Sequence, residues 1–122
     1  MSGSAADRRT GVERIADERI RQVAGRGLEH DFVYNDLGQL AWAAVCYACP
    51  SGQVYRKTEY ACGVKFEDPW PWQPEHDNRS RTDNVVDRAG QSVGDRIREL
   101  EKAGALVAAE IDRLLKEEEG ML

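Results

Sequence analysis

The stretch that decides the fold reads Ser92-Val-Gly-Asp-Arg-Ile-Arg-Glu-Leu-Glu-Lys-Ala-Gly-Ala-Leu-Val-Ala-Ala-Glu-Ile-Asp-Arg-Leu-Leu-Lys-Glu-Glu-Glu119. Seven of its residues recur at alternating intervals of four and three, and we call them the apolar stripe: Val93, Ile97, Leu100, Gly104, Val107, Ile111 and Leu114. This spacing predicts one long helix with an apolar surface along one side. A single helix cannot bury its own apolar side, so the stripe requires a partner from this chain or from a second copy.

Two shorter helices are expected before this stretch. The first begins at Thr10, which is followed three residues later by a glutamate as in a capping box, and it ends at Gly25 and Gly27. The second covers residues 37–49, in which apolar residues and alanines share one face. Alanines allow helices to approach closely, and the surface around Gly104 offers similarly small residues on the last helix.

The middle of the chain has a different character. Residues 53–68 alternate weakly between apolar and polar side chains, as in a short hairpin, and the prolines of residues 69–74 exclude a regular helix. The patterns predict a mainly α fold of two to three packed helices, with a long C-terminal helix and a short extended or β excursion. We expect residues 1–9 to be disordered and residues 10–119 to form a single helical domain, completed by homo-oligomerisation through the C-terminal helix.

Composition excludes several classes of function. The 122 residues carry a net charge of -5 with a pI near 5.1, whereas general nucleic-acid-binding proteins are usually basic. The chain has no run of about 18 apolar residues, so we expect no membrane-spanning helix. The N-terminus lacks the apolar core of a signal peptide, and three cysteines make a poor disulfide framework. We therefore expect a cytoplasmic protein.

The cysteines allow two interpretations. Cys46, Cys49 and Cys62 could supply three sulfur ligands to a tetrahedral zinc ion, with His76 or His30 as the nitrogen ligand. Alternatively, Cys46 and Cys49 lie on adjacent turns of a helix, in a face of alanines where buried thiols behave as small apolar side chains. Because a complete pair of Cys-x-x-Cys motifs is absent, we expect no bound metal or other cofactor.

Catalytic motifs are scarce in this sequence. It contains neither a Gly-x-Ser-x-Gly elbow nor a glycine-rich phosphate-binding loop. Helical nucleotide pyrophosphohydrolases hold magnesium with facing Glu-x-x-Glu and Glu-x-x-Asp pairs, but Glu110 and Asp112 have a different spacing. The segment from Glu29 to Asp31, with His30 between them, could be an acid–base pair or a surface turn. A non-enzymatic protein is favoured.

Trp70-Pro-Trp72 is the most unusual feature of the expected surface. The prolines at positions 69, 71 and 74 restrict the backbone and so hold both indole rings at low entropic cost. The rings could cover the helical core as a lid. Equally, they could form a platform on which a nucleobase stacks or an anchor for a partner protein. Four basic residues could reach phosphates beside such a platform: Arg26, Lys65, Arg79 and Arg81.

Three segments together resemble a family of small phage and prophage proteins. They are Glu18-Arg-Ile-Arg-Gln-Val-Ala-Gly-Arg-Gly-Leu-Glu-His-Asp31, then Gly38-Gln-Leu-Ala-Trp-Ala-Ala-Val-Cys-Tyr-Ala48, then Trp70-Pro-Trp72 followed by residues 100–114. The family pattern includes E-R-x-R-Q, G-E-L-A-x-A-A-x-Y-A, W-P-W and K-A-G-A-L-x-x-A-E-I-x-R-L. The resemblance covers about half of the chain, in family order, although Gln39 stands where the family usually has glutamate.

The resemblance implies an accessory role in the contest between phage and host defences. We therefore expect a non-enzymatic anti-defence protein in the host cytoplasm that sequesters a nucleotide-derived immune signal, of the cyclic nucleotide or cyclic ADP-ribose type, in a pocket at a subunit interface. The expected ligand-binding residues are Arg26, His30, Tyr34, Lys65, Trp70, Trp72, Arg79 and Arg81. The alternatives are a protein–protein inhibitor of a host defence enzyme, or a small metal-dependent protein like a nucleotide pyrophosphohydrolase.

Overall fold

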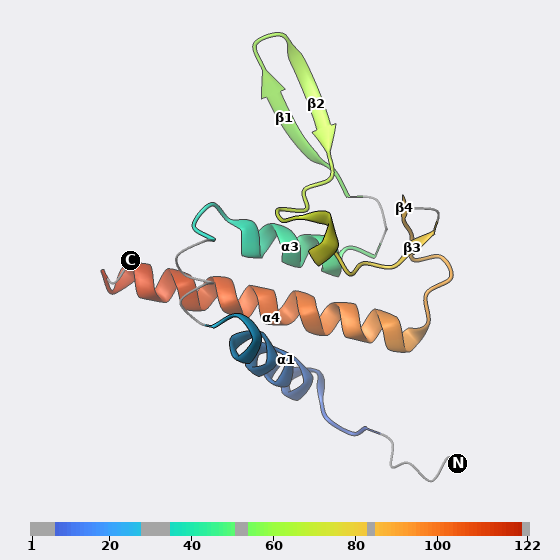
Figure 1. Cartoon of the computed structure of the whole chain (residues 1–122), viewed down its shortest axis with the longest axis vertical. Helices are drawn as coiled ribbons and strands as arrows, with labels where there is room; N and C mark the ends of the chain where they lie inside the picture. Colours follow the sequence, from blue (N-terminus) through green and yellow to red (C-terminus); the bar gives the residue numbers. More distant parts are fainter. Residues whose placement is uncertain (1–6, 28–34, 51–53, 83–84, 121–122) are drawn as a thin grey trace.

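A computed structural model of the chain describes residues 7–27, 35–50, 54–82 and 85–120. The helices α1 (Gly11–Arg26), α3 (Gln39–Ala48) and α4 (Val93–Glu118) form the body of the molecule. Both α1 and α3 pack against α4, which is the central element (Figure 1). The prediction of a mainly α fold with a long C-terminal helix is confirmed. No helix in the described ranges is long and apolar enough to cross a membrane.

The helices begin where the sequence provides caps. The Thr10 hydroxyl accepts a hydrogen bond from the Glu13 amide at 3.3 Å, and the Glu13 carboxylate accepts one from the Thr10 amide at 2.9 Å. Ser92 caps α4 in the same way, accepting from the Asp95 amide at 3.0 Å. α3 begins at Gln39, two residues later than expected, because Gly38 is left-handed with φ of 80°.

The alternating segment forms a hairpin, so the predicted β excursion is confirmed. β1 (Arg56–Tyr60) and β2 (Gly63–Glu67) pair antiparallel, with Thr58 opposite Lys65. The hairpin stands away from the helices (Figure 1). The remaining elements are the 3-10 helix η1 (Pro74–His76) and the two-residue strands β3 (Arg81–Thr82) and β4 (Val85–Val86), which pair with each other. Residues 7–9 precede α1 without regular structure; of the expected disordered N-terminus, residues 1–6 lie outside the described ranges.

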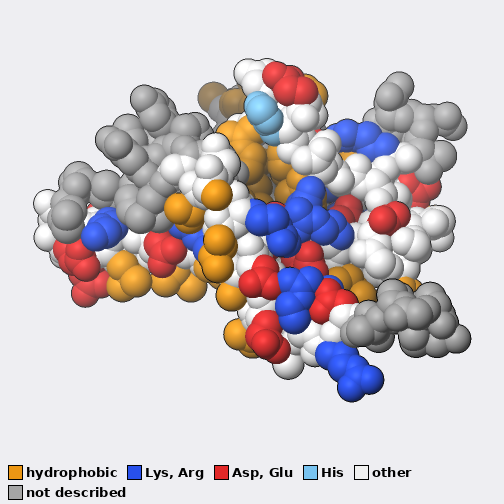
Figure 2. All heavy atoms as spheres, turned by 60° about the horizontal axis from the view of Figure 1, so that its bottom comes forward, with side chains coloured by type: hydrophobic (Ala, Val, Ile, Leu, Met, Phe, Trp, Pro, Cys, Tyr) orange, Lys and Arg blue, Asp and Glu red, His pale blue; other side chains and the backbone are white. Residues whose placement is uncertain are grey.

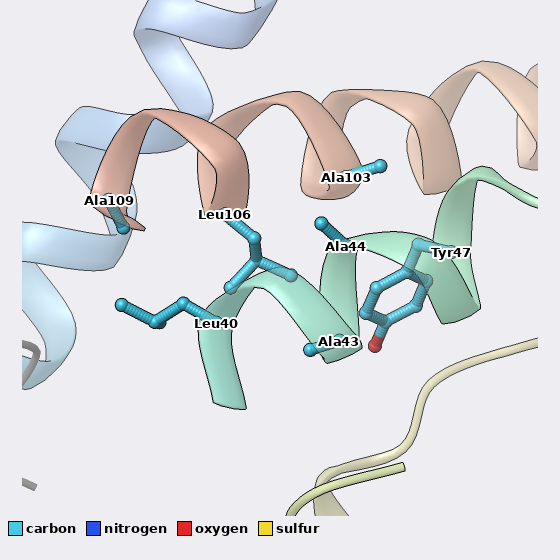
Figure 3. Packing of buried hydrophobic residues seen from close by; sticks show 7 residues of the cluster. All are labelled: Leu40, Ala43, Ala44, Tyr47, Ala103, Leu106 and Ala109. Carbon is cyan, nitrogen blue, oxygen red and sulfur yellow. The ribbon is translucent and has the colours of Figure 1, made fainter. Parts of the chain in front are cut away.

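The buried core lies between α3 and α4 (Figure 3). It consists of one leucine, one tyrosine and two alanines of α3 with one leucine and two alanines of α4: Leu40, Tyr47, Ala43, Ala44, Leu106, Ala103 and Ala109. The alanines bring the two backbones close, and the larger side chains fill the space that remains. Alanines of the second and last helices therefore pack together as predicted, whereas Gly104 itself faces Ile15 of α1 and not α3.

A buried carboxylate attaches the segment before α4 to this helix. Glu99 accepts hydrogen bonds from Gln91 Nε2 at 2.7 Å, Arg88 Nε at 2.9 Å and the Ser80 amide at 3.1 Å. Burial by itself would raise the pKa of Glu99, but these hydrogen bonds outweigh it and the pKa is lowered. The negative charge of Glu99 thus holds Ser80, Arg88 and Gln91 against α4.

Most of the apolar stripe faces away from this core. Ile97, Leu100, Val107, Ile111 and Leu114 are 39–52% exposed and Val93 is 77% exposed. Within the described residues α1 meets the stripe at Gly104, whose surface contacts Ile15. The other members of the stripe keep 39% or more of their surface exposed. The described residues of one chain therefore cover the stripe only in part.

Gly104 allows α1 to approach α4 very closely. A Cβ atom at this position would lie 2.5 Å from Ile15 Cδ1 and 2.7 Å from Ile15 Cγ1. Real Cβ atoms essentially never approach other heavy atoms this closely, so any larger residue must displace Ile15. The glycine therefore sets the distance between the two helices.

We expect Gly104→Ala to lower the free energy of unfolding by about 1–2 kcal/mol, because the overpacking against Ile15 exceeds the gain in helix propensity. Urea unfolding followed by circular dichroism measures it. The control is Gly94→Ala, whose Cβ would meet nothing closer than 3.9 Å, and which should not destabilise the protein. Adding Ile15→Ala to Gly104→Ala should cost less than Ile15→Ala alone. Equal stability of Gly104→Ala and the parent would contradict the close contact.

Candidate ligand-binding site

A pocket of about 790 Å³ opens between α1, α3, α4 and residues 70–78. Figure 2 shows this hollow, with hydrophobic side chains in its depth, the histidine on one side and Lys or Arg side chains on the other. The volume falls in the range of about 300–1,000 Å³ that is typical of small-molecule sites. Its described lining residues come from all three helices, from Asn35 and from the Trp-Pro-Trp segment with the residues that follow it.

Three aromatic rings form the apolar wall of the pocket. Tyr47 contacts Trp70, and Trp70 contacts Trp72, each pair edge-to-face with ring centroids 5.5 Å apart. Trp72 Nε1 donates to Asn35 Oδ1 at 2.9 Å, and Trp70 Nε1 donates to the Gln73 carbonyl at 3.2 Å. Both indoles also pack against the buried core. The two interpretations of the Trp-Pro-Trp segment are thus compatible, since the rings cover the core and also line the pocket.

Lys102 is the basic residue of the pocket that has no matching carboxylate. Its ammonium lies 5.6 Å from the centre of the Tyr47 ring and forms no ion pair with any carboxylate in the described ranges. Burial lowers the pKa of Lys102, and the nearby charge of Arg98 lowers it further. The nearby carboxylates of Glu18 and Glu99 act in the opposite direction, and a bound anion would do the same. Lys102 is therefore a candidate contact for the negative group of a ligand.

Arg98, one turn earlier on α4, is already neutralised. Its Nη1 atom lies 2.6 Å from Glu18 Oε1 and 3.2 Å from Glu101 Oε1. The hydrogen bond that Arg98 donates to Glu18 raises the pKa of Arg98. For Glu18, the hydrogen bonds donated by Arg98 and Arg21 outweigh burial, so its pKa is lowered. Arg98 is thus engaged by carboxylates of the same chain, whereas Lys102 has no ion pair in the described ranges; Glu75 also lines the pocket.

Gln22 contributes an unused acceptor to the pocket. Its Oε1 atom is buried and receives no hydrogen bond from the described residues. An unmet buried acceptor costs about 1–3 kcal/mol, and a ligand N–H group would satisfy it. Gln22 follows Glu18 by four residues on α1, and both side chains line the pocket.

The residues expected to bind a ligand have different positions in the structure. Trp70 and Trp72 line the pocket, whereas Lys65 lies on the hairpin and pairs with Glu67 at 3.5 Å. Arg81 pairs with Asp77. The structure does not describe His30, Tyr34 or the side chain of Arg26.

Arg79 supports the aromatic wall from behind. Its side chain is 1% exposed, and Nη2 lies 2.6 Å from Asp77 Oδ2 and 2.9 Å from Asp68 Oδ2. The guanidinium also lies 5.4 Å from the centre of the Trp70 ring. Arg79 is not among the residues that line the pocket. It therefore fixes the position of Trp70 instead of facing the hollow.

Lys102 and Gln22 were not expected from the sequence. Lys102 lies within a helix of alternating charges, where an exposed lysine is the ordinary interpretation. The only available signal is its place in the row Arg98, Lys102 and Leu106, on the opposite side of α4 from Gly104. Gln22 gives no signal at all, because its importance depends on which helix packs beside it.

The proposed zinc ligands do not assemble in the described parts of the chain. Cys46 is fully buried in α3, and burial raises its pKa to about 11. Cys62 is exposed in the turn of the hairpin. Among the described residues there is no group of three or more His, Cys, Asp or Glu side chains that could hold a metal ion. Cys46 behaves as a small apolar residue.

Comparisons with protein family models, with curated proteins and with solved structures find no match to this chain.

We expect Arg79→Ala to lower the free energy of unfolding by about 3–5 kcal/mol, because it leaves the Asp77 carboxylate, 2% exposed, without its buried partner. Urea unfolding measures the change. Lys65→Ala is the control and should alter stability by less than about 0.5 kcal/mol, since Lys65 is exposed. An Arg79→Ala protein of parental stability would show that Arg79 is not structural.

Proposed function

We propose that this chain is a non-enzymatic binding protein that holds a nucleotide-derived molecule in the pocket. The supporting observation is the meeting of three features in one hollow: the Trp70–Trp72 wall, the Lys102 ammonium and the buried Gln22 acceptor, neither of which has an ion-pair or hydrogen-bond partner among the described residues. A nucleotide carries a planar base, N–H donors and a negatively charged phosphate. The base can stack on aromatic rings, and the ammonium of a lysine can bind the phosphate as a positive point charge.

The biological role that we propose is sequestration of an immune signal of the cyclic nucleotide or cyclic ADP-ribose type, in the host cytoplasm. The resemblance to phage and prophage proteins supports this role. Sequestration requires affinity and enough protein to lower the free concentration of the signal, and no bond of the ligand has to break. The pocket supplies means of binding, while the carboxylates Glu110 and Asp112 are held by Arg113 at 2.6 Å and by Arg19 at 3.2 Å.

We expect the purified protein to bind a cyclic dinucleotide or a cyclic ADP-ribose isomer and to release it unaltered after heat denaturation. Lys102→Met should weaken binding roughly 10- to 100-fold, because it removes a hydrogen bond to a charged group. Calorimetry gives the affinity, and chromatography of the heated supernatant identifies the ligand. Lys65→Met is the matched control and should bind like the parent. Unchanged affinity of Lys102→Met, or a chemically altered ligand, would contradict the proposal.

The exposed apolar stripe favours a second candidate function, which is inhibition of a host defence enzyme by surface contact. Ile97, Leu100 and Ile111 offer the kind of apolar surface that protein interfaces bury. A stoichiometric protein partner recovered from host lysate, with no bound small molecule, would favour this function over sequestration.

We further propose that a second copy of the chain covers the apolar stripe. Its alternating intervals of four and three are those by which paired helices pack, and a two-fold interface uses the same surface on both copies. Arg98, Lys102 and Leu106 lie on the opposite side of α4, so this contact would leave the pocket open. The ligand site and the oligomer interface are then separate.

We expect Ile111→Glu to break the contact through the apolar stripe, and so to lower the mass of the assembly without unfolding the chain, because Ile111 is 52% exposed in the single copy and would be buried in the pair. Sedimentation velocity measures the mass, and circular dichroism checks the fold. Ile20→Glu changes an apolar residue of α1 that is 66% exposed, and this control should leave the oligomer intact. A monomeric parent protein would refute the interface.

A further inference from the structure

The β1–β2 hairpin projects from the helical body (Figure 1). Every residue of its two strands is exposed except Thr58, which is half-buried. Within the described ranges each of these strands pairs only with the other, so each has a free edge of backbone N–H and C=O groups. An isolated two-stranded hairpin is marginally stable in water, and a sheet with more strands is more stable.

The order of side chains on β1 is complementary to itself. When two copies of Arg56-Lys-Thr-Glu-Tyr60 run antiparallel with Thr58 opposite Thr58, Lys57 of each copy lies opposite Glu59 of the other. Arg56 of each copy then lies opposite Tyr60 of the other, while its guanidinium lies 4.9 Å from the centre of the Trp42 ring of its own chain. Pairs of opposite charge, pairs of threonines and contacts between a cation and an aromatic ring all stabilise neighbouring strands.

Other pairings of the hairpin lack this complementarity. If two β2 strands paired antiparallel about their centres, Lys65 would face Lys65, and like charges directly opposite each other are destabilising. If two β1 strands ran parallel in register, each charged residue would lie beside the same residue of the other copy, so like charges would be neighbours. Charges on an edge strand usually prevent other strands from pairing with it. The charges on β1 therefore disfavour most partner strands and favour a second β1 strand that runs antiparallel.

We propose that β1 pairs antiparallel with β1 of a second copy, centred on Thr58, to form one four-stranded sheet in the order β2-β1-β1-β2. Each β1 strand then lies inside the sheet and is paired on both sides, and the alternating charges of Lys57 and Glu59 fix the register. Within one chain Lys57 Nζ already lies 3.1 Å from Glu59 Oε1, so the pairing extends this ion pair into a cluster of four charges. The interface uses neither the pocket nor the apolar stripe, and it does not depend on the proposed ligand.

The test uses charge reversal in the Ile111→Glu chain, in which the apolar stripe no longer contributes to assembly. We expect this chain to dimerise through the hairpin. Lys57→Glu or Glu59→Lys alone should raise the dissociation constant about tenfold or more, because two attractive pairs per dimer become repulsive. The double variant Lys57→Glu/Glu59→Lys should recover the dimer, and an equimolar mixture of the two single variants should form heterodimers. Native mass spectrometry distinguishes these species.

Lys65→Glu is the matched control, because it reverses a charge on β2 and should leave the dimer unchanged. Hydrogen exchange of β1 amides should be slower at concentrations where the dimer forms. A monomeric Ile111→Glu chain, failure of the double variant or of the mixture to associate, or dissociation caused by Lys65→Glu would each overturn the proposal. A hairpin that captures a strand of a host protein while this chain stays monomeric would overturn it as well.

Discussion

The close approach of two helices to α4 is the constraint on which the rest of this structure depends. Gly104 leaves no room for a Cβ atom beneath Ile15, and alanines of α3 meet alanines of α4. Small residues bring backbones together and leave little apolar volume between them, so the core is narrow. The Trp-Pro-Trp segment then covers the side of this core that the helices leave open, and the pocket forms beneath it.

The distribution of charge around the pocket follows from this arrangement. Arg79, Arg88 and Arg98 are engaged by carboxylates of the same chain, and two of these three side chains are almost fully buried. Such pairs orient the segments that connect the helices, because a buried charge without its partner is very unfavourable. The abundance of arginine in the sequence is thus largely structural. Lys102 differs, since it points at the aromatic wall and has no carboxylate partner among the described residues.

Two surfaces of the chain are incomplete in a single copy. One is the apolar stripe of α4, whose side chains are half exposed, and the other is the free edge of β1. A partner would interact with them differently. The stripe offers apolar area to bury, whereas the edge offers backbone hydrogen-bonding groups and alternating charged side chains. If both bind second copies, the chain assembles beyond a dimer, while the pocket stays within each copy.

The sequence by itself determined the local features of this protein. The caps at Thr10 and Ser92, the long helix and the hairpin follow from contacts between residues that are close in the chain. The Trp-Pro-Trp segment of residues 70–72 indicated the aromatic part of the site for the same reason. Each of these signals lies within a few residues, so no knowledge of distant packing is needed to recognise it.

Only the tertiary structure decided which faces of α4 are buried and which residues share the pocket. Periodicity shows that an apolar stripe exists, but among the described residues α1 meets it at Gly104, and α3 packs on a different face of α4, where alanines permit close contact. The same packing sent Arg79 into an internal ion pair and placed Lys102 and Gln22 in the hollow. These outcomes depend on side chains that are far apart in the sequence, such as Arg19 and Asp112, which are separated by 93 positions. A pattern read along the chain has no access to such pairs, because the energy that selects them arises only when the helices meet.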